Sequence, residues 1–164
     1  MNIVKTTLLA AALFGAGAAP ALAADTVNFN VKIVIQTACD IAASAPTDVD
    51  FGSVASTATN IDNAGTLRVR CTPGSAYNIA LNNGQNGAAV TDRKMAKGTD
   101  FVPYQLYRAA ARGVGDVWGA TVGTNTYAGT GNGAVQDVTV FGRVPSANFP
   151  AGSYNDVVMA TIIY

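Results

Sequence analysis

The chain has 164 residues, with ten Lys and Arg against ten Asp and Glu, so its formal net charge is zero. It therefore has no basic excess of the kind that marks nucleic-acid binding, and we expect no nucleic-acid partner. Histidine is absent, which removes the commonest general base and metal ligand. We expect no catalytic, cofactor-binding or metal-binding residues, and hence no enzyme. The length suits one domain.

Residues 1–23 have the pattern of a secretory signal peptide. Lys5 is followed by an uncharged, alanine-rich stretch, and Ala21-Leu22-Ala23 gives the small-x-small pattern of a cleavage site. A membrane anchor is the alternative, but the apolar run is short for a span. We expect cleavage after Ala23 and a mature chain that is exported with no membrane-spanning segment.

Residues 26–36 carry the most regular alternation in the sequence. One face holds only apolar side chains, and the other is polar except for Val34. Alternation of this kind predicts a β-strand. The apolar face consists of Val27, Phe29, Val31, Ile33 and Ile35.

The rest of the chain predicts short strands separated by turns. All acidic residues are aspartates, and the 17 glycines also favour turns over helices. We expect a helical turn only at 107–112, and we expect 129–133 to be a hairpin loop. Many short strands with regular turns indicate an all-β antiparallel sandwich. The expected strands are 50–52, 66–71, 76–81, 93–97, 100–108, 135–144 and 154–164.

Cys39 and Cys71 are the two cysteines. An even number of cysteines in an exported chain predicts a disulfide, because the periplasm is oxidising. Two free buried thiols are the alternative. We expect the bond to join the first strand of the domain to a neighbouring strand.

The remaining candidates for chemistry are weak. Asp48 and Asp50 could pair as acid and base, but they fall in a polar loop beside a turn, which is typical of solvated carboxylates. The glycine-rich stretch at 129–133 lacks the Lys-Ser/Thr that follows a phosphate-binding loop.

Both ends of the mature chain are apolar strands. The N-terminal one precedes the first cysteine, and the C-terminal one, residues 157–164, runs to the last residue. Each could be an ordinary edge strand of a closed domain. The sharper hypothesis is β-strand addition, in which one strand is given to another chain and one groove receives a strand.

An ordered set of motifs resembles the spore coat protein U domain family, which includes subunits of Csu-type (archaic) chaperone–usher pili. The most specific part is the C-terminal third. The matching residues are Asp50-Phe51-Gly52, Arg93-Lys94-Met95, Tyr104-Gln105-Leu106-Tyr107, Trp118-Gly119, Phe141-Gly142-Arg143-Val144-Pro145 and Pro150 to Asp156, together with Cys39 and Cys71.

The resemblance implies an incomplete immunoglobulin-like sandwich over residues 36–164, completed by donor-strand exchange. A periplasmic chaperone and an outer-membrane usher would assist assembly with identical or related subunits into a fimbria at the cell surface, serving adhesion and biofilm formation. Residues 24–35 would be the donor strand, with the apolar face above entering a neighbour. The edge strand of the groove would contribute Val158, Ala160, Ile162 and Tyr164.

Two other classes of function remain open at this point. One is a secreted coat or matrix protein with the same fold. The other is a monomeric carbohydrate-binding module, in which Trp118, Tyr127 and Tyr154 would stack on sugars, although core packing is the commoner fate of such side chains.

Overall fold

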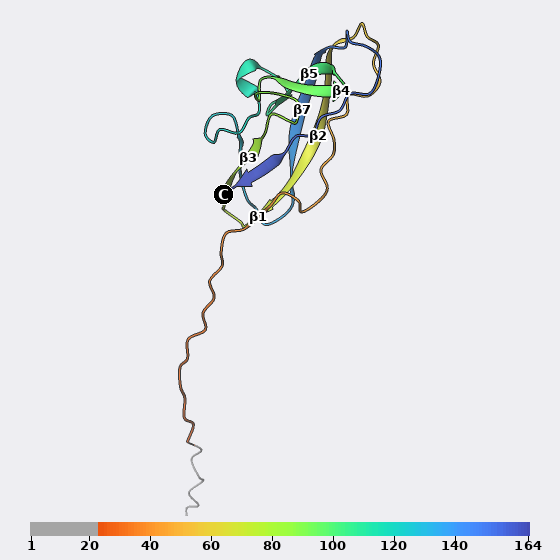
Figure 1. Ribbon diagram of the computed structural model, residues 1–164. Coiled ribbons are helices and arrows are strands. Elements are labelled where there is room, and N and C mark those ends of the chain that lie inside the picture. Colours follow the sequence, from red (N-terminus) through yellow and green to blue (C-terminus); the bar gives the residue numbers. More distant parts are fainter. Residues whose placement is uncertain (1–22) are drawn as a thin grey trace, which may run out of the picture. The chain divides into compact units, whose positions relative to one another are not determined.

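A computed structural model describes residues 23–164 (Figure 1). It divides into a segment up to Val34 and a domain from Ile35 to Tyr164. The segment is extended, without regular secondary structure. The domain contains a 3₁₀-helix, η1 (Val114–Asp116), and eight strands: β1 (Cys39–Asp40), β2 (Thr59–Cys71), β3 (Ala76–Leu81), β4 (Arg93–Lys97), β5 (Asp100–Tyr107), β6 (Tyr127–Thr130), β7 (Gln136–Ser146) and β8 (Ala160–Ile163).

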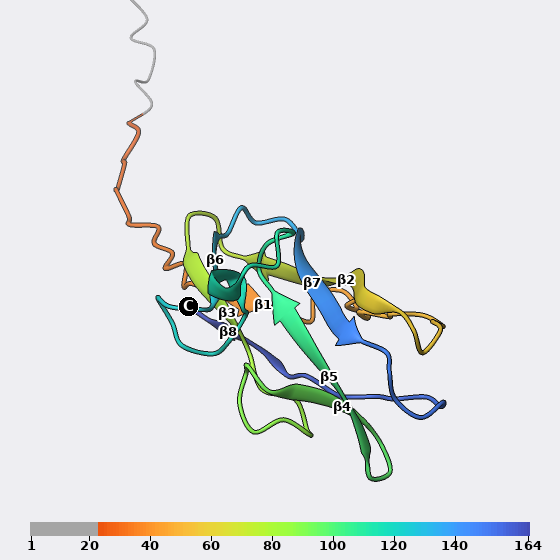
Figure 2. The ribbon, with the colours of Figure 1, turned by 90° about the horizontal axis from the view of Figure 1, so that it is seen from above.

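The strands form two antiparallel sheets. One sheet has the order β1-β2-β7-β5-β4 and the other the order β6-β3-β8. The longest pairing joins β2 to β7, from Thr59 opposite Ser146 to Val69 opposite Gln136, and Figure 2 shows these two strands side by side. In β7 the buried residues alternate with exposed or partly buried ones, as expected where one face of a strand packs on a core. The predicted all-β antiparallel sandwich is confirmed.

The core lies between the sheets, and Trp118 is one of its central residues. Its side chain is completely buried, and its indole N–H donates a 2.7 Å hydrogen bond to the carbonyl of Ile79. The ring of Tyr127 lies 5.6 Å away, centroid to centroid. A buried indole needs such a partner for its N–H, so Trp118 is a structural residue and is not exposed for stacking on a sugar.

Two local predictions are wrong. Residues 50–52 form a turn and not a strand, because the Asp50 carboxylate accepts a 2.8 Å hydrogen bond from the Gly52 N–H and Gly52 has a φ of +69°. Residues 129–133 are not a hairpin loop, because β6 and β7 belong to different sheets. At 129–133 the short motif was compatible with both outcomes, and the long-range pairing of β6 with β3 decided between them. At 50–52 the local hydrogen bond between Asp50 and Gly52 decided.

Two predicted boundaries also move. The helical turn expected at 107–112 is replaced by η1 a few residues later. The C-terminal strand is ladder-paired only over Ala160–Ile163, although Asn155 forms an isolated bridge with Ala96 of β4. The segment from Asn155 to β8 therefore passes from the edge of one sheet to the edge of the other.

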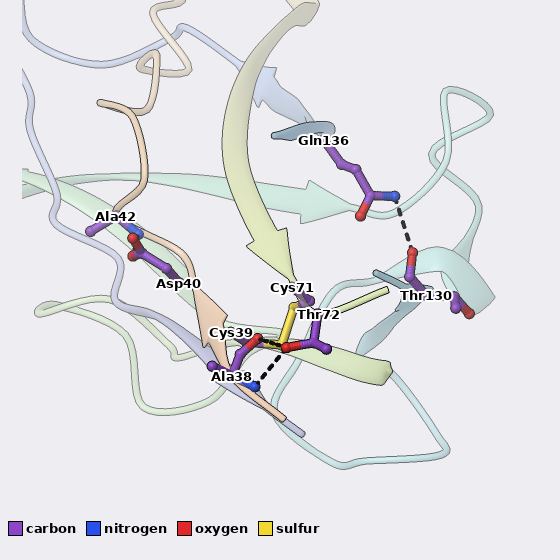
Figure 3. Close-up of a disulfide and its surroundings, with 8 residues drawn as sticks. All are labelled: Ala38, Cys39, Asp40, Ala42, Cys71, Thr72, Thr130 and Gln136. Atoms are coloured by element: carbon purple, nitrogen blue, oxygen red, sulfur yellow. Dashed lines mark hydrogen bonds between the residues drawn. A yellow bond between two sulfur atoms is a disulfide. The ribbon is translucent and has the colours of Figure 1, made fainter. Parts of the chain in front are cut away.

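The disulfide joins β1 to β2. Cys39 and Cys71 are bonded and lie directly opposite each other in the two-strand ladder (Figure 3). Next to the bond, the Thr72 N–H donates to the Ala38 carbonyl at 2.9 Å and the Ala38 N–H donates to the Thr72 hydroxyl at 3.0 Å. The predicted pairing, and its place at the first strand of the domain, are confirmed.

We expect the double substitution Cys39→Ser with Cys71→Ser to lower stability by about 3–4 kcal/mol, because the closed loop of about 33 residues regains its freedom in the unfolded state. Thermal and denaturant unfolding of the oxidised and the substituted protein measures this difference. A control is Ser75→Ala, which leaves the disulfide intact. Equal stability of the double variant and the parent would show that the bond does not stabilise the domain.

Candidate functional site

The domain contains an open groove of about 1200 Å³ between the two sheets. Its floor is the inner face of the five-stranded sheet. This face is apolar because the strands alternate, so that every second side chain points into the groove. The floor residues are Leu67 of β2, Met95 of β4, Val102 and Leu106 of β5, and Val140 and Val144 of β7.

Two chain segments border the groove. The first is the loop 46–56, which is held to β2 by a pair of hydrogen bonds between Thr47 and Thr66. From this loop Val49 and Phe51 reach over the floor, and Gly142 of β7 lacks a side chain where they approach it. The second border is the segment leading into β8, with Val158 and Ala160 on its inner side.

The border formed by β8 has a free main-chain edge. On its paired side, the Asn82 N–H donates to the Met159 carbonyl at 3.1 Å, and the Met159 N–H donates to the Asn82 side-chain oxygen at 2.9 Å. Successive residues of a strand direct these groups to opposite sides. The N–H and C=O groups of Val158, Ala160 and Ile162 therefore point away from β3, toward the groove. An apolar floor beside an unpaired edge is suited to bind an extended peptide strand.

One end of the groove is polar. The Asp156 carboxylate accepts hydrogen bonds from the Tyr104 hydroxyl at 2.6 Å, the Gln85 N–H at 2.8 Å and the Asn86 side chain at 3.1 Å. Burial, together with the bond to Asp156, raises the pKa of Tyr104, so it remains a protonated donor. Gly84 fits here because a Cβ at this position would collide with the carboxylate. This network ties the border segment to β5 and to the loop after β3.

Arg93 supports this end from inside the core. Its side chain is completely buried, and six hydrogen bonds go to uncharged oxygens on four chain segments. Among them, the carbonyls of Asn82 and Trp118 accept at 2.6 and 2.8 Å. Burial lowers the pKa of Arg93, whereas Tyr104 and Asp156 raise it. Arginine keeps its charge in proteins, so Asp156 provides a nearby opposite charge.

The predicted site residues occupy distinct places. In the N-terminal segment the apolar face is exposed, from 77% for Ile35 to 87% for Val27. Of the predicted groove-edge residues, Val158, Ala160 and Ile162 are partly buried against the core, and Tyr164 is 61% exposed beyond the end of β8. Of the four, Val158 and Ala160 line the groove, and Ile162 follows them in β8.

Sequence reasoning missed the floor and the polar end. Alternation in β5 and β7 gave a signal for the floor, because it identifies the even-numbered residues as one face. Arg93, Tyr104 and Asp156 gave no comparable signal. An arginine in a strand normally indicates a solvent face, and its burial depends on carbonyl groups supplied by distant loops.

Within residues 23–164, no group of three or more His, Cys, Asp or Glu side chains could hold a metal ion. In the same part of the chain, no helix has the length and apolar character needed to cross a membrane.

The fold and groove define a small all-β domain with an apolar, strand-sized opening. The family model of the Spore Coat Protein U domain matches residues 25–161. Protein U of Myxococcus xanthus is 37% identical over a 182-residue alignment that spans the whole of both chains. The chain belongs to the spore coat protein U domain family.

A solved structure supports the fold. The CsuC–CsuE chaperone–tip adhesion subunit pre-assembly complex, from archaic chaperone–usher Csu pili of Acinetobacter baumannii, contains a chain that matches with a TM-score of 0.56 and 24% identity. The match covers 79% of this chain and 40% of that chain. The protein therefore has the two-sheet fold found in that complex.

We expect Arg93→Lys to destabilise the domain by at least about 2 kcal/mol, because a single ammonium cannot satisfy all the buried carbonyls, and each unpaired one costs about 1–3 kcal/mol. Chemical denaturation of the purified chain measures the loss. Arg70→Lys, on an exposed position of β2, is the matched control and should change stability little. Equal, small effects of the two substitutions would show that the buried guanidinium is not needed.

Proposed function

We propose that this chain is a structural subunit of a surface fibre that polymerises by donor-strand complementation. The observation that carries the proposal is the open groove, where an apolar floor lies beside the unpaired main-chain edge of the segment 158–163. Residues 24–35 of a second copy are the proposed occupant, with the domain at 36–164 as the acceptor.

The chemistry of the N-terminal segment suits the groove. If this segment bound in the groove as a strand, it would place five apolar side chains on the floor, and its main chain would pair with the edge of β8. Burying each side chain is worth roughly 1.5–3 kcal/mol. The five together give on the order of 10 kcal/mol, which is an upper estimate because part of this surface is already shielded in the unassembled state.

This function requires export and assistance. Residues 1–23 would be the secretory signal, and they lie outside the described residues except for Ala23. A chaperone is the natural partner before assembly, since the similar structure is a chaperone–subunit complex by its title. An usher and further copies of this or related chains would complete a fimbria, used in adhesion and biofilm formation.

A coat layer is the second candidate, because the family takes its description from spore coats. The same strand addition would hold neighbouring subunits together in a coat. Genes for a chaperone and an usher beside this gene would favour the pilus. A carbohydrate-binding module is disfavoured, since Trp118 is buried in the core and the Tyr154 hydroxyl bonds the Pro150 carbonyl at 2.7 Å.

Phe29→Asp and Ile33→Asp should abolish or strongly weaken fibres, because each puts an unpaired charge on the apolar floor. Asn30→Asp, on the opposite face of the same strand, should leave fibres nearly intact. Electron microscopy of the assembled material and its resistance to heat in detergent compare the three variants. Equal effects of Phe29→Asp and Asn30→Asp would contradict this choice of inward face.

A further inference from the structure

The border segment 157–163 is apolar on both faces. Its inner face packs on the core, but three residues of its outer face are largely exposed: Val157 at 63%, Met159 at 65% and Ile163 at 41%. Thr161 is the polar residue between them. The outer face of an ordinary edge strand is polar, so this apolar stripe needs a separate explanation.

The N-terminal segment has a matching irregularity. Its outer face reads Asn28, Asn30, Lys32 and Val34, so Val34 is its only apolar residue, and it is 86% exposed. If the segment occupies the groove of another copy, as proposed above, its outer face will lie beside the outer face of the border segment. The exposed Val34 would then lie beside the exposed apolar residues of the border segment.

The direction of the donor strand follows from where the chain leaves the domain. Residue 35 is joined through 36–38 to β1, which lies at the Cys71 end of β2, and β8 ends near the start of β3 at that same end. A donor antiparallel to β8 places its own domain beyond the Asp156 end of the acceptor. All copies then point the same way and the chain can continue indefinitely. A donor strand parallel to β8 would instead bring the Cys71 ends of the two domains together, and these are the ends from which both donor segments leave.

Alternation fixes the parity of the register. Residues directly opposite each other in an antiparallel pair point to the same face. The inward side chains are odd-numbered in the donor and even-numbered in the border segment. Odd-numbered donor residues must therefore lie opposite even-numbered residues of the border segment. The outer-face pairs are then non-hydrogen-bonded pairs, in which the side chains lie closest.

One register satisfies both faces. It places Phe29, Val31 and Ile33 opposite Ile162, Ala160 and Val158. On the outside it places Val34 opposite Val157 and Asn30 opposite Thr161. A two-residue slip one way puts Ile33 opposite the Asp156 carboxylate. A slip the other way moves Phe29 from the partly buried Ile162 to the exposed Tyr164.

We propose that Val34 of one copy packs against Val157 of the next and sets the register of strand exchange. The inward face supplies most of the binding area, but it repeats every two residues, so it discriminates weakly between slips. On the outer face, Val34 lies opposite the apolar Val157 in the favoured register but opposite the polar Asn155 in one slip. The other slip would place Val34 opposite the apolar Met159, and it is opposed on the inner face, where Phe29 would leave the partly buried Ile162 for the exposed Tyr164. This inference rests on the proposed function.

Cross-linking in polymers of the full-length chain tests the register. The variant Val34→Cys with Val157→Cys should give a ladder of disulfide-linked oligomers on non-reducing gels, because cross-strand pairs lie within the Cα separation that a disulfide needs. Val34→Cys with Asn155→Cys and Val34→Cys with Met159→Cys represent the two slipped registers and should give severalfold less. Peptide mapping must show that Cys39 and Cys71 remain paired to each other. Ile33→Cys with Val158→Cys reports on strand addition itself, through the inner face.

Each result has a distinct meaning. A dominant Val157 ladder supports the inference. A dominant Asn155 or Met159 ladder overturns the register and leaves strand exchange intact. Cross-linking through Ile33 and Val158 alone shows that Val34 makes no such contact. Failure of all four pairs overturns donor-strand exchange, and the register with it.

Discussion

The half-paired C-terminal strand is the constraint on which the other features of the domain depend. On one side β8 is bonded to β3, and on the other its N–H and C=O groups face an apolar groove. Water can satisfy the polar groups of the edge, but it is a poor neighbour for the floor. An extended segment with alternating apolar residues satisfies both at once, because its main chain bonds the edge while every second side chain covers the floor.

The polar end of the groove is fastened by several contacts. Here Asp156 and Tyr104 tie the border segment to β5, and the bridge between Asn155 and Ala96 adds two main-chain bonds, at 2.8 and 3.1 Å. Away from the groove, the disulfide joins β1 to β2 within the five-stranded sheet. A groove held in this way needs little further ordering when a strand enters, which favours binding. The buried Arg93 belongs to the same arrangement, since its bonds join the loops that surround the polar end.

The sequence was sufficient where local patterns and tertiary packing agree. The strands at 76–81 and 93–97 have the predicted bounds, and those near 100–108 and 135–144 differ by a residue or two, because alternation with a buried face identifies a strand directly. The cysteine pair also followed from composition and compartment. The sequence was insufficient where pairing partners lie far apart. Nothing local shows that the glycines at 129–133 connect two different sheets, or that distant carbonyls surround Arg93. The groove itself was expected only through the family resemblance, because an empty space between sheets leaves no pattern in a single chain.

The same features that would drive assembly make the unassembled chain hazardous to a cell. A strand of alternating apolar residues and an open apolar edge are both templates for unspecific pairing. Net charge gives little protection, since positive and negative residues balance in the full sequence. In the proposed assembly, correct pairing would compete with slipped pairing on similar inward contacts, because the inward alternation alone repeats every two residues. Discrimination between the correct and the slipped registers would have to come from positions that break the two-residue repeat. The carboxylate at Asp156 breaks it inside the groove by disfavouring an apolar residue opposite. Val34 breaks it on the outside, where the other donor residues are polar and only certain acceptor positions are apolar. Under this proposal, the exceptions to the alternation would decide the register of assembly, and the regular apolar positions would supply most of its binding energy.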